Sequence, residues 1–267
     1  MKAPIGVIDS GVGGLTVATE LMRQLPKESI IYFGDTKRCP YGPRPKEEVE
    51  QFTWQMVRFL LKKQMKMLVV ACNTATAFTL EQLRETLDIP VIGVIQPGAR
   101  AALTQSWSAD IGVIGTEGTI KSKSYQQAIH HINANITVRD LACPQFVPIV
   151  EQGIQSNKDI YETVYQSLRP LKNFDKMDTL ILGCTHYPML RDVIQEVMGQ
   201  HISIISSGEE TAREVSTILG YHHKLYEGDE PPIHHYFTSG DAIVFRKIAT
   251  EWMQQPIHHV DSIHLTD

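Results

Sequence analysis

Short runs rich in apolar residues alternate along this chain with longer segments in which apolar residues recur every three or four positions. The short runs occupy residues 5–8, 29–33, 67–71, 91–95, 110–114, 136–141, 179–183 and 202–206. Alternation of short buried strands with helical patterns is typical of parallel sheets joined by crossover helices. The pattern therefore predicts an α/β fold.

Two of the helical segments carry an apolar stripe, one in each half of the chain. Helical spacing places the residues of such a stripe on one face, which we expect to pack against a sheet. The stripes consist of Phe78, Leu80, Leu83 and Leu87 in the first half and of Leu190, Val193, Ile194 and Val197 in the second.

Three landmarks recur in the same order in the two halves. The run I-G-V-I that begins at Ile5 returns at Ile111, 106 positions later, and the pair Cys39-Pro40 returns 104 positions later as Cys143-Pro144. A cysteine behind a buried strand occurs at Cys72 and again 112 positions later. Nearly constant offsets favour two α/β halves of similar architecture.

The end of the chain lies outside this repeat. Its helical segment carries Phe245, Ile248 and Trp252 on one face, and we expect it to pack back on the first half. The sequences Q-P-G at residues 96–98 and S-S-G at 206–208 predict a hinge into the second half and a return from it. We therefore expect a discontinuous first domain, residues 1–96 and 207–267, and a second domain, residues 97–206.

Composition narrows the class of protein. The chain has 267 residues and a formal charge of −5, which disfavours a nonspecific nucleic-acid binder because such proteins need a basic face. It has neither a signal-peptide pattern nor a long apolar span, so we expect no membrane association. The four cysteines lie far apart in a chain too large to need disulfides, which favours reduced thiols in the cytoplasm.

Two of these thiols are candidates for chemistry. Cys72 and Cys184 each follow a buried strand and are expected to begin a helix, whose N–H groups would favour the thiolate. Two such thiols in equivalent settings suggest a reaction that needs one acid or base on each side of a substrate.

Polar residues beside these strand ends are candidates for binding. Asp9 and Ser10 end the first strand before glycines that let backbone amides approach a ligand, although a tight turn or a dinucleotide fingerprint would also explain them. Amide, hydroxyl and imidazole groups follow the two cysteines, and helix capping alone would explain only one of them. These groups belong to Asn73, Thr74, Thr76, Thr185 and His186.

The remaining cysteines and histidines give weaker signals. Cys39 lies in a polar loop and Cys143 precedes a helix expected near Pro144, so a structural role is the simpler interpretation for both. The histidine pairs at residues 130–131, 222–223, 234–235 and 258–259 have no ligand partners at metal-binding spacing. We expect them to be mostly solvated, and we expect no metal site.

Taken together, the motifs resemble those of bacterial glutamate racemases. They are I-G-V-I-D-S-G-V-G-G-L-T-V, Y-F-G-D-T, C-P-Y-G, V-V-A-C-N-T-A-T and L-G-C-T-H-Y-P, and they span residues 5–188. The resemblance implies two flavodoxin-like domains related by a pseudo-twofold axis, with the active site between them. It also implies a cytoplasmic, homodimeric isomerase that interconverts L- and D-glutamate without a cofactor and supplies D-glutamate for peptidoglycan.

The resemblance also implies roles for individual residues of this chain. It assigns proton transfer to Cys72 and Cys184, and it assigns a supporting acid or base role to Asp9, His186 and Glu151. Substrate contacts fall on Asp9, Ser10, Pro40, Tyr41, Gly42, Asn73, Thr74, Thr185 and His186.

Two other interpretations of the sequence stay open. The first is an aspartate racemase of the same superfamily, against which His186 after Cys-Thr argues. The second is a nonenzymatic α/β protein that binds a nucleotide or small ligand through the glycines at residues 11–14, and it leaves the paired cysteines unexplained.

Overall fold

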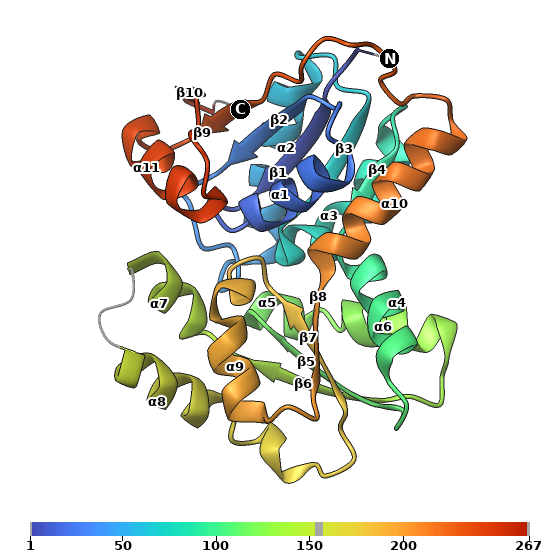
Figure 1. The fold of residues 1–267 in the computed structure, drawn as a ribbon, viewed down its shortest axis with the longest axis vertical. Coiled ribbons are helices and arrows are strands. Elements are labelled where there is room, and N and C mark those ends of the chain that lie inside the picture. The colour runs from blue at the N-terminus through green and yellow to red at the C-terminus, as the bar shows by residue number, and fades with distance from the viewer. Residues whose placement is uncertain (1, 153–156, 266–267) are drawn as a thin grey trace.

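A computed structural model describes residues 2–152 and 157–265, and it has two lobes, each built around a parallel sheet (Figure 1). The sheet of the first lobe has six strands in the order β10-β9-β2-β1-β3-β4, all paired in parallel. Its strands are β1 (Ile5–Asp9), β2 (Ile30–Gly34), β3 (Met67–Val70), β4 (Val91–Gly93), β9 (His235–Thr238) and β10 (His259–Ser262).

The sheet of the second lobe has four parallel strands in the order β6-β5-β7-β8. They are β5 (Asp110–Gly115), β6 (Thr137–Ala142), β7 (Thr179–Gly183) and β8 (Ser203–Ser206). This order repeats the order β2-β1-β3-β4 of the first sheet, which begins the flavodoxin-like arrangement. The predicted fold class is confirmed, and the sequence repeat corresponds to a repeat of strand order.

Helices cover both faces of each sheet, which is why the strands are apolar throughout. In β1, Val7 packs with α1, α10 and α11, whereas Ile8 points to the other face and packs with α2 and α3. In the first lobe these helices are α1 (Leu15–Gln24), α2 (Lys46–Leu61), α3 (Asn73–Thr86), α10 (Ser207–Tyr221) and α11 (Ala242–Met253).

The second lobe is layered in the same way. One face of its sheet packs against α7, α8 and α9, and the other face packs against α4 and α6. The elements are α4 (Ile95–Gln105), α5 (Glu117–Lys121), α6 (Ser124–Ile132), α7 (Phe146–Gln152), α8 (Asn157–Leu168), the 3₁₀ turns η1 (Leu171–Asn173) and η2 (Tyr187–Leu190), and α9 (Arg191–Met198). Among the described helices, none is long and apolar enough to cross a membrane.

The predicted apolar stripes face the cores. Leu80 and Leu83 of α3 are buried, and their counterparts in the second lobe lie in one cluster with α7 and α8. Phe245 is buried against α1, with Ile248 and Trp252 partly buried beside it. The expectation that the end of the chain packs back on the first half is therefore confirmed.

The hinge predicted at residues 96–98 stays a prediction, and its residues follow the passage of the chain from β4 of the first lobe to α4 of the second. These residues lie in the first turn of α4, where Pro97 is tolerated because N–H groups of a first turn have no partner within the helix. Residues 206–208 join β8 to α10, and α10 packs along α1 of the first lobe. The domain limits 1–96, 97–206 and 207–267 stay a prediction, and residues 1, 266 and 267 lie outside the described residues.

Candidate functional site

The carboxyl ends of four strands surround one small cavity. Because neighbouring parallel strands end at the same edge, β1 and β3 bring their strand-end residues together, and β5 and β7 do the same in the second lobe. The cavity measures about 10 Å³. It is lined from both lobes by Ser10, Pro40, Tyr41, Gly42, Cys72, Asn73, Thr74, Thr116, Val147, Cys184, Thr185 and His186.

Cys72 lies two residues beyond β3 and is the N-cap of α3. Its Sγ accepts a hydrogen bond from the backbone N–H of Ala75 at 3.4 Å, as expected for a side chain at a helix N-terminus. Burial and the charge of Asp9 raise the pKa of this thiol, and the N–H of Ala75 and the hydroxyl of Ser10 lower it, so that the net pKa is about 12. The helix N–H lowers the pKa of Cys72 as the sequence predicts, but burial outweighs it, and Cys72 is a thiol at neutral pH.

Cys184 follows β7, but the expectation that it begins a helix is wrong. Thr185 and His186 come first, and the chain then forms the 3₁₀ turn η2, with Pro188 in its first turn, before α9 begins at Arg191. This arrangement brings Nδ1 of His186 to 3.8 Å from Sγ of Cys184, within sulfur hydrogen-bonding distance. The sulfur of Cys184 therefore contacts an imidazole, whereas the sulfur of Cys72 contacts a backbone N–H of a helix.

His186 is buried and is held from both ring nitrogens. Its Nε2 lies 3.1 Å from Oε1 of Glu151 on α7, and its Nδ1 faces Cys184. Burial lowers the pKa of His186, but the contacts with Cys184 and Glu151 and the charge of Asp9 outweigh burial and raise it to about 10. The ring therefore carries two protons at neutral pH and can keep a negative charge on a neighbouring sulfur.

Asp9 is fully buried at the end of β1. Its Oδ2 accepts the N–H of Gly11 at 2.9 Å, and its Oδ1 accepts the hydroxyl of Thr185 at 3.2 Å across the two lobes. Burial raises the pKa of Asp9, while the charge of His186 and the hydrogen bonds from Gly11, Gly14 and Thr185 lower it in part. A carboxyl group whose pKa is raised in this way is suited to accepting and returning a proton.

Glu151 links the histidine to a thiol that the sequence assigned only a structural role. Cys39 Sγ donates to Glu151 Oε1 at 3.0 Å, from the loop between β2 and α2. Burial raises the pKa of Glu151, but the hydrogen bond and charge of His186 and the hydrogen bond from Cys39 more than reverse this, so the net change is downward. Cys39, Glu151 and His186 come from three separate segments, which no spacing along the chain could reveal.

Comparison with known proteins identifies the family. The model for Asp/Glu/hydantoin racemases matches residues 5–215. The chain is 61% identical over 255 residues to a glutamate racemase of Oceanobacillus iheyensis, with 96% of this chain and 93% of that protein covered. This chain belongs to the glutamate racemase family. It is therefore an amino-acid racemase, an isomerase, and the nonenzymatic alternative falls.

Solved structures of this family have the same fold. A glutamate racemase isoform from Bacillus anthracis matches with a TM-score of 0.95 at 51% identity, covering 98% of both chains. The glutamate racemase of Francisella tularensis in complex with D-glutamate matches with a TM-score of 0.91 at 32% identity, covering 99% of this chain and 98% of that one.

Most of the substrate contacts expected for a racemase lie at the cavity. Eight of the nine line it, namely Ser10, Pro40, Tyr41, Gly42, Asn73, Thr74, Thr185 and His186. The hydroxyl of Tyr41, however, donates a hydrogen bond to Asp35 Oδ2 at 2.5 Å. Asp9 does not line the cavity, but it accepts a hydrogen bond from Thr185, which does.

Thr116 and Val147 also line the cavity, although neither was predicted from the sequence. Thr116 could have been found, because the repeat pairs Asp9-Ser10 at the end of β1 with G-T at residues 115–116. Its hydroxyl contacts those of Thr74 at 2.8 Å and Thr119 at 3.1 Å. This hydroxyl cluster gives the cavity a polar wall from the second lobe.

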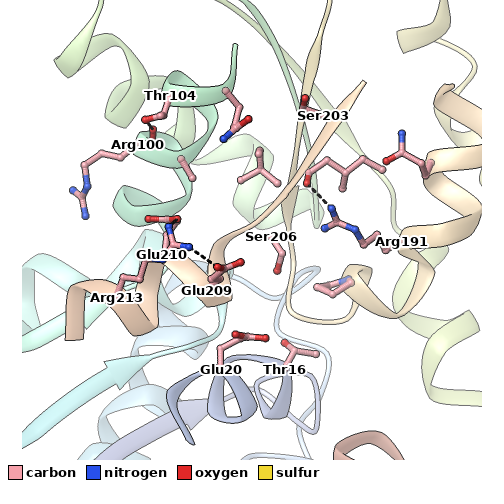
Figure 2. Close-up of a pocket in the computed structure, with 16 residues that line it drawn as sticks. Thr16, Glu20, Arg100, Thr104, Arg191, Ser203, Ser206, Glu209, Glu210 and Arg213 are labelled. Atoms are coloured by element: carbon pink, nitrogen blue, oxygen red, sulfur yellow. Dashed lines mark hydrogen bonds and ion pairs between the residues drawn. The ribbon is translucent and has the colours of Figure 1, made fainter. Parts of the chain in front are cut away.

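A larger cavity of about 860 Å³ lies elsewhere, between α1, α4, α9 and α10 (Figure 2). Two of its arginines already have partners, since Arg213 pairs with Glu209 and Glu210, and Arg191 donates to the carbonyl of Ile204. None of the strand-end thiols lines it. The racemase site is therefore assigned to the smaller cavity on chemical grounds rather than by size.

Proposed function

We propose that this racemase interconverts L- and D-glutamate by moving the α-proton between two thiols. The observation that carries the proposal is that Cys72 and Cys184, from the ends of two different sheets, line the same cavity. The complex of the Francisella tularensis relative with D-glutamate supports glutamate as the substrate. The alternative substrate, aspartate, differs only in the length of its side chain.

In the proposed reaction, one sulfur takes the α-proton as the other returns a proton to the opposite face. Abstraction makes the α-carbon planar, and protonation from the far side inverts it. Cys184 serves as the base for L-glutamate and Cys72 as the base for D-glutamate, each as a thiolate, while the other is a thiol. Each sulfur must come within about 3 to 3.5 Å of the carbon for this transfer.

The neighbours of the two sulfurs hold the protons between turnovers. On the side of Cys184, the protonated His186 holds the proton that Cys184 gives up as a thiolate, and Glu151 stabilises the charge of the imidazolium. On the side of Cys72, the carboxylate of Asp9 accepts the proton, since its raised pKa brings it closer to that of the thiol. Burial opposes thiolate formation at Cys72, so a nearby acceptor is required.

The polar lining then holds the substrate by its charged ends. The amide of Asn73 and the hydroxyls of Ser10, Thr74 and Thr185 are suited to the α-carboxylate, and the loop at residues 40–42 is suited to the side-chain carboxylate. A cavity of about 10 Å³ has room for about one water molecule. The two lobes must therefore move apart to admit an amino acid, and their closure excludes water from the reaction.

We further propose that the reaction supplies D-glutamate for peptidoglycan in the cytoplasm and that the enzyme acts as a homodimer. These proposals rest on the family resemblance of the motifs.

Circular dichroism of the amino acids tests the proposed function. Protein that has been dialysed and treated with a chelator is incubated with each enantiomer of glutamate and of aspartate. We expect both enantiomers of glutamate to lose their optical signal completely, and aspartate to be unaffected. Activity on aspartate alone would overturn the substrate, and activity only after addition of pyridoxal phosphate or a metal would overturn the mechanism.

A further inference from the structure

Three side chains of types that bind transition metals meet beside the reaction cavity. The Sγ of Cys39, an oxygen of Glu151 and the Nε2 of His186 all lie within 4.8 Å of one another. Oε1 of Glu151 lies in the centre, 3.0 Å from the sulfur and 3.1 Å from the nitrogen. Two of the three, Glu151 and His186, belong to the proposed proton relay, and Cys39 has no part in it.

The donor set and the spacing suit zinc. Thiolate, imidazole and carboxylate are its usual ligands, and tetrahedral bonds of about 2.0 to 2.3 Å place ligand atoms about 3.3 to 3.6 Å apart. The contacts of 3.0 and 3.1 Å need to widen by a few tenths of an ångström, and the sulfur and the imidazole nitrogen, which lie within 4.8 Å of each other, must also reach this spacing. The side chain of Glu151 is 34% exposed, so it can move outward and leave a fourth position for water.

The position of the sulfur is fixed by the turn after β1. A Cβ added at Gly11 would lie 2.9 Å from Sγ of Cys39 and 3.7 Å from Oε1 of Glu151. The first distance is too short for a carbon beside a sulfur and the second is an ordinary contact, so glycine at this position leaves room for the sulfur where it now lies.

We propose that Cys39, Glu151 and His186 form an inhibitory site for Zn²⁺ or a similar divalent cation. The inhibitory part rests on the proposed function, since it acts by removing the group that holds the proton of Cys184. The bound ion would take the lone pair of His186 Nε2, and Glu151 would face the metal instead of the ring. His186 would then be fixed as a neutral imidazole with its proton on Nδ1, unable to accept a second one.

The protons released when the metal binds make its affinity depend on pH. Binding displaces the thiol proton of Cys39 and the Nε2 proton of His186 to solvent, while the carboxylate and the ion keep their charges. Affinity therefore rises with pH. The titratable groups that face these two side chains are Asp9, Cys72, Glu151 and Cys184, and Trp252 of α11 places its ring 6.0 Å from that of His186.

Titration of the whole protein with Co²⁺ and Zn²⁺, without substrate, tests the site. Cobalt bound to a thiolate gives a charge-transfer band in the near ultraviolet, and we expect this band in the unmodified protein and its loss on adding Zn²⁺. The Cys39→Ser variant should lose the band, and Glu151→Gln should weaken binding by at least about 10- to 100-fold. Cys143→Ser is the matched control, because that thiol is buried in the second lobe and is not one of the three candidate ligands.

Several outcomes would overturn the site. One is that the unmodified protein shows no charge-transfer band, and another is that the band persists in Cys39→Ser. A third is that the band disappears in Cys184→Ser but not in Cys39→Ser. Far-ultraviolet circular dichroism confirms that each variant is folded.

Inhibition is measured separately, as the activity of each protein with zinc divided by its own activity without zinc. We expect zinc to inhibit the unmodified enzyme reversibly, with recovery on adding a chelator, and to inhibit Cys39→Ser far less. Equal inhibition of both proteins would refute the regulatory role. Metal binding in a protein that does not racemise glutamate would instead refute the proposed function and leave the site standing.

Discussion

Replacing Glu151 by glutamine tests whether its carboxylate keeps His186 protonated. Glutamine preserves the size of the side chain and its ability to accept a hydrogen bond, but it removes the charge 3.1 Å from Nε2. An opposite charge at such a distance shifts a pKa by about 1 to 3 units. Because Glu151 is 34% exposed, water screens part of this effect, and we expect the pKa of His186 to fall from about 10 by about 1 to 2 units.

The assay is a titration of the histidine ring resonances by NMR. A His186→Asn protein identifies the resonance, and Glu162→Gln, which changes an exposed glutamate of α8, is the control. The control should leave the pKa of His186 where it is in the unmodified protein. A pKa that is also unchanged in Glu151→Gln would refute the reasoning, because the charge of Glu151 would then have no part in holding the proton.

The same change predicts a pH dependence of stability. The pKa of His186 in the folded protein lies above its ordinary value of 6.5, so protonation stabilises the fold fully below pH 6.5, and this contribution is lost as the pH rises through about 10. In Glu151→Gln the loss over this range should be smaller by about 1 to 3 kcal/mol. Urea unfolding of both proteins at the two ends of the range measures the difference.

Three further predictions concern the thiols, the proton and the fold. Cys72→Ala and Cys184→Ala should each lower the rate of racemisation by at least about 10³-fold with native circular dichroism, whereas Cys143→Ala should keep most of the activity; loss in all three would refute our sorting of the thiols. In heavy water, product should carry deuterium at the α-carbon from the first turnovers, and product that keeps its original hydrogen would indicate a single base. Lys66→Met should lower stability by about 3 to 5 kcal/mol, because it leaves Glu28 buried without the partner now 2.5 Å away; an unchanged thermal midpoint would contradict this.

The architecture could be predicted from the sequence because it depends on periodicity. The apolar runs predicted the strands. The repeat of I-G-V-I and of the strand-end cysteines predicted two halves of similar architecture, and β5–β8 do repeat the order of β1–β4. The kind of element at the predicted hinge could not be predicted, because Q-P-G is compatible with a loop or with the start of a helix, and at residues 96–98 it lies in the first turn of α4. Local patterns do not distinguish a turn from the first turn of a helix.

The site was predictable only where its residues adjoin a strand end. Asp9 and Cys72 could be placed at one edge of the first sheet because parallel strands end together, and Cys184 at the corresponding edge of the second. The thiol of Cys39 could not, since its contact with Glu151 depends on how the loop after β2 meets α7 across the two lobes. The protonation state of Cys72 was also beyond the sequence, because the helix terminus is visible in the pattern and the depth of burial is not.

The two sulfurs have unlike partners in an enzyme whose proposed substrates are mirror images. Cys72 faces backbone amides and the carboxylate of Asp9, whereas Cys184 faces an imidazole held by Glu151. Because enantiomers have equal free energies in water, the equilibrium constant is one, and kcat/KM must be the same in both directions whatever the residues do. A change on one side, such as Glu151→Gln, must therefore lower kcat/KM equally for L- and D-glutamate. The asymmetry can appear only in kcat and KM separately, in isotope effects, and in which sulfur holds the proton before substrate binds.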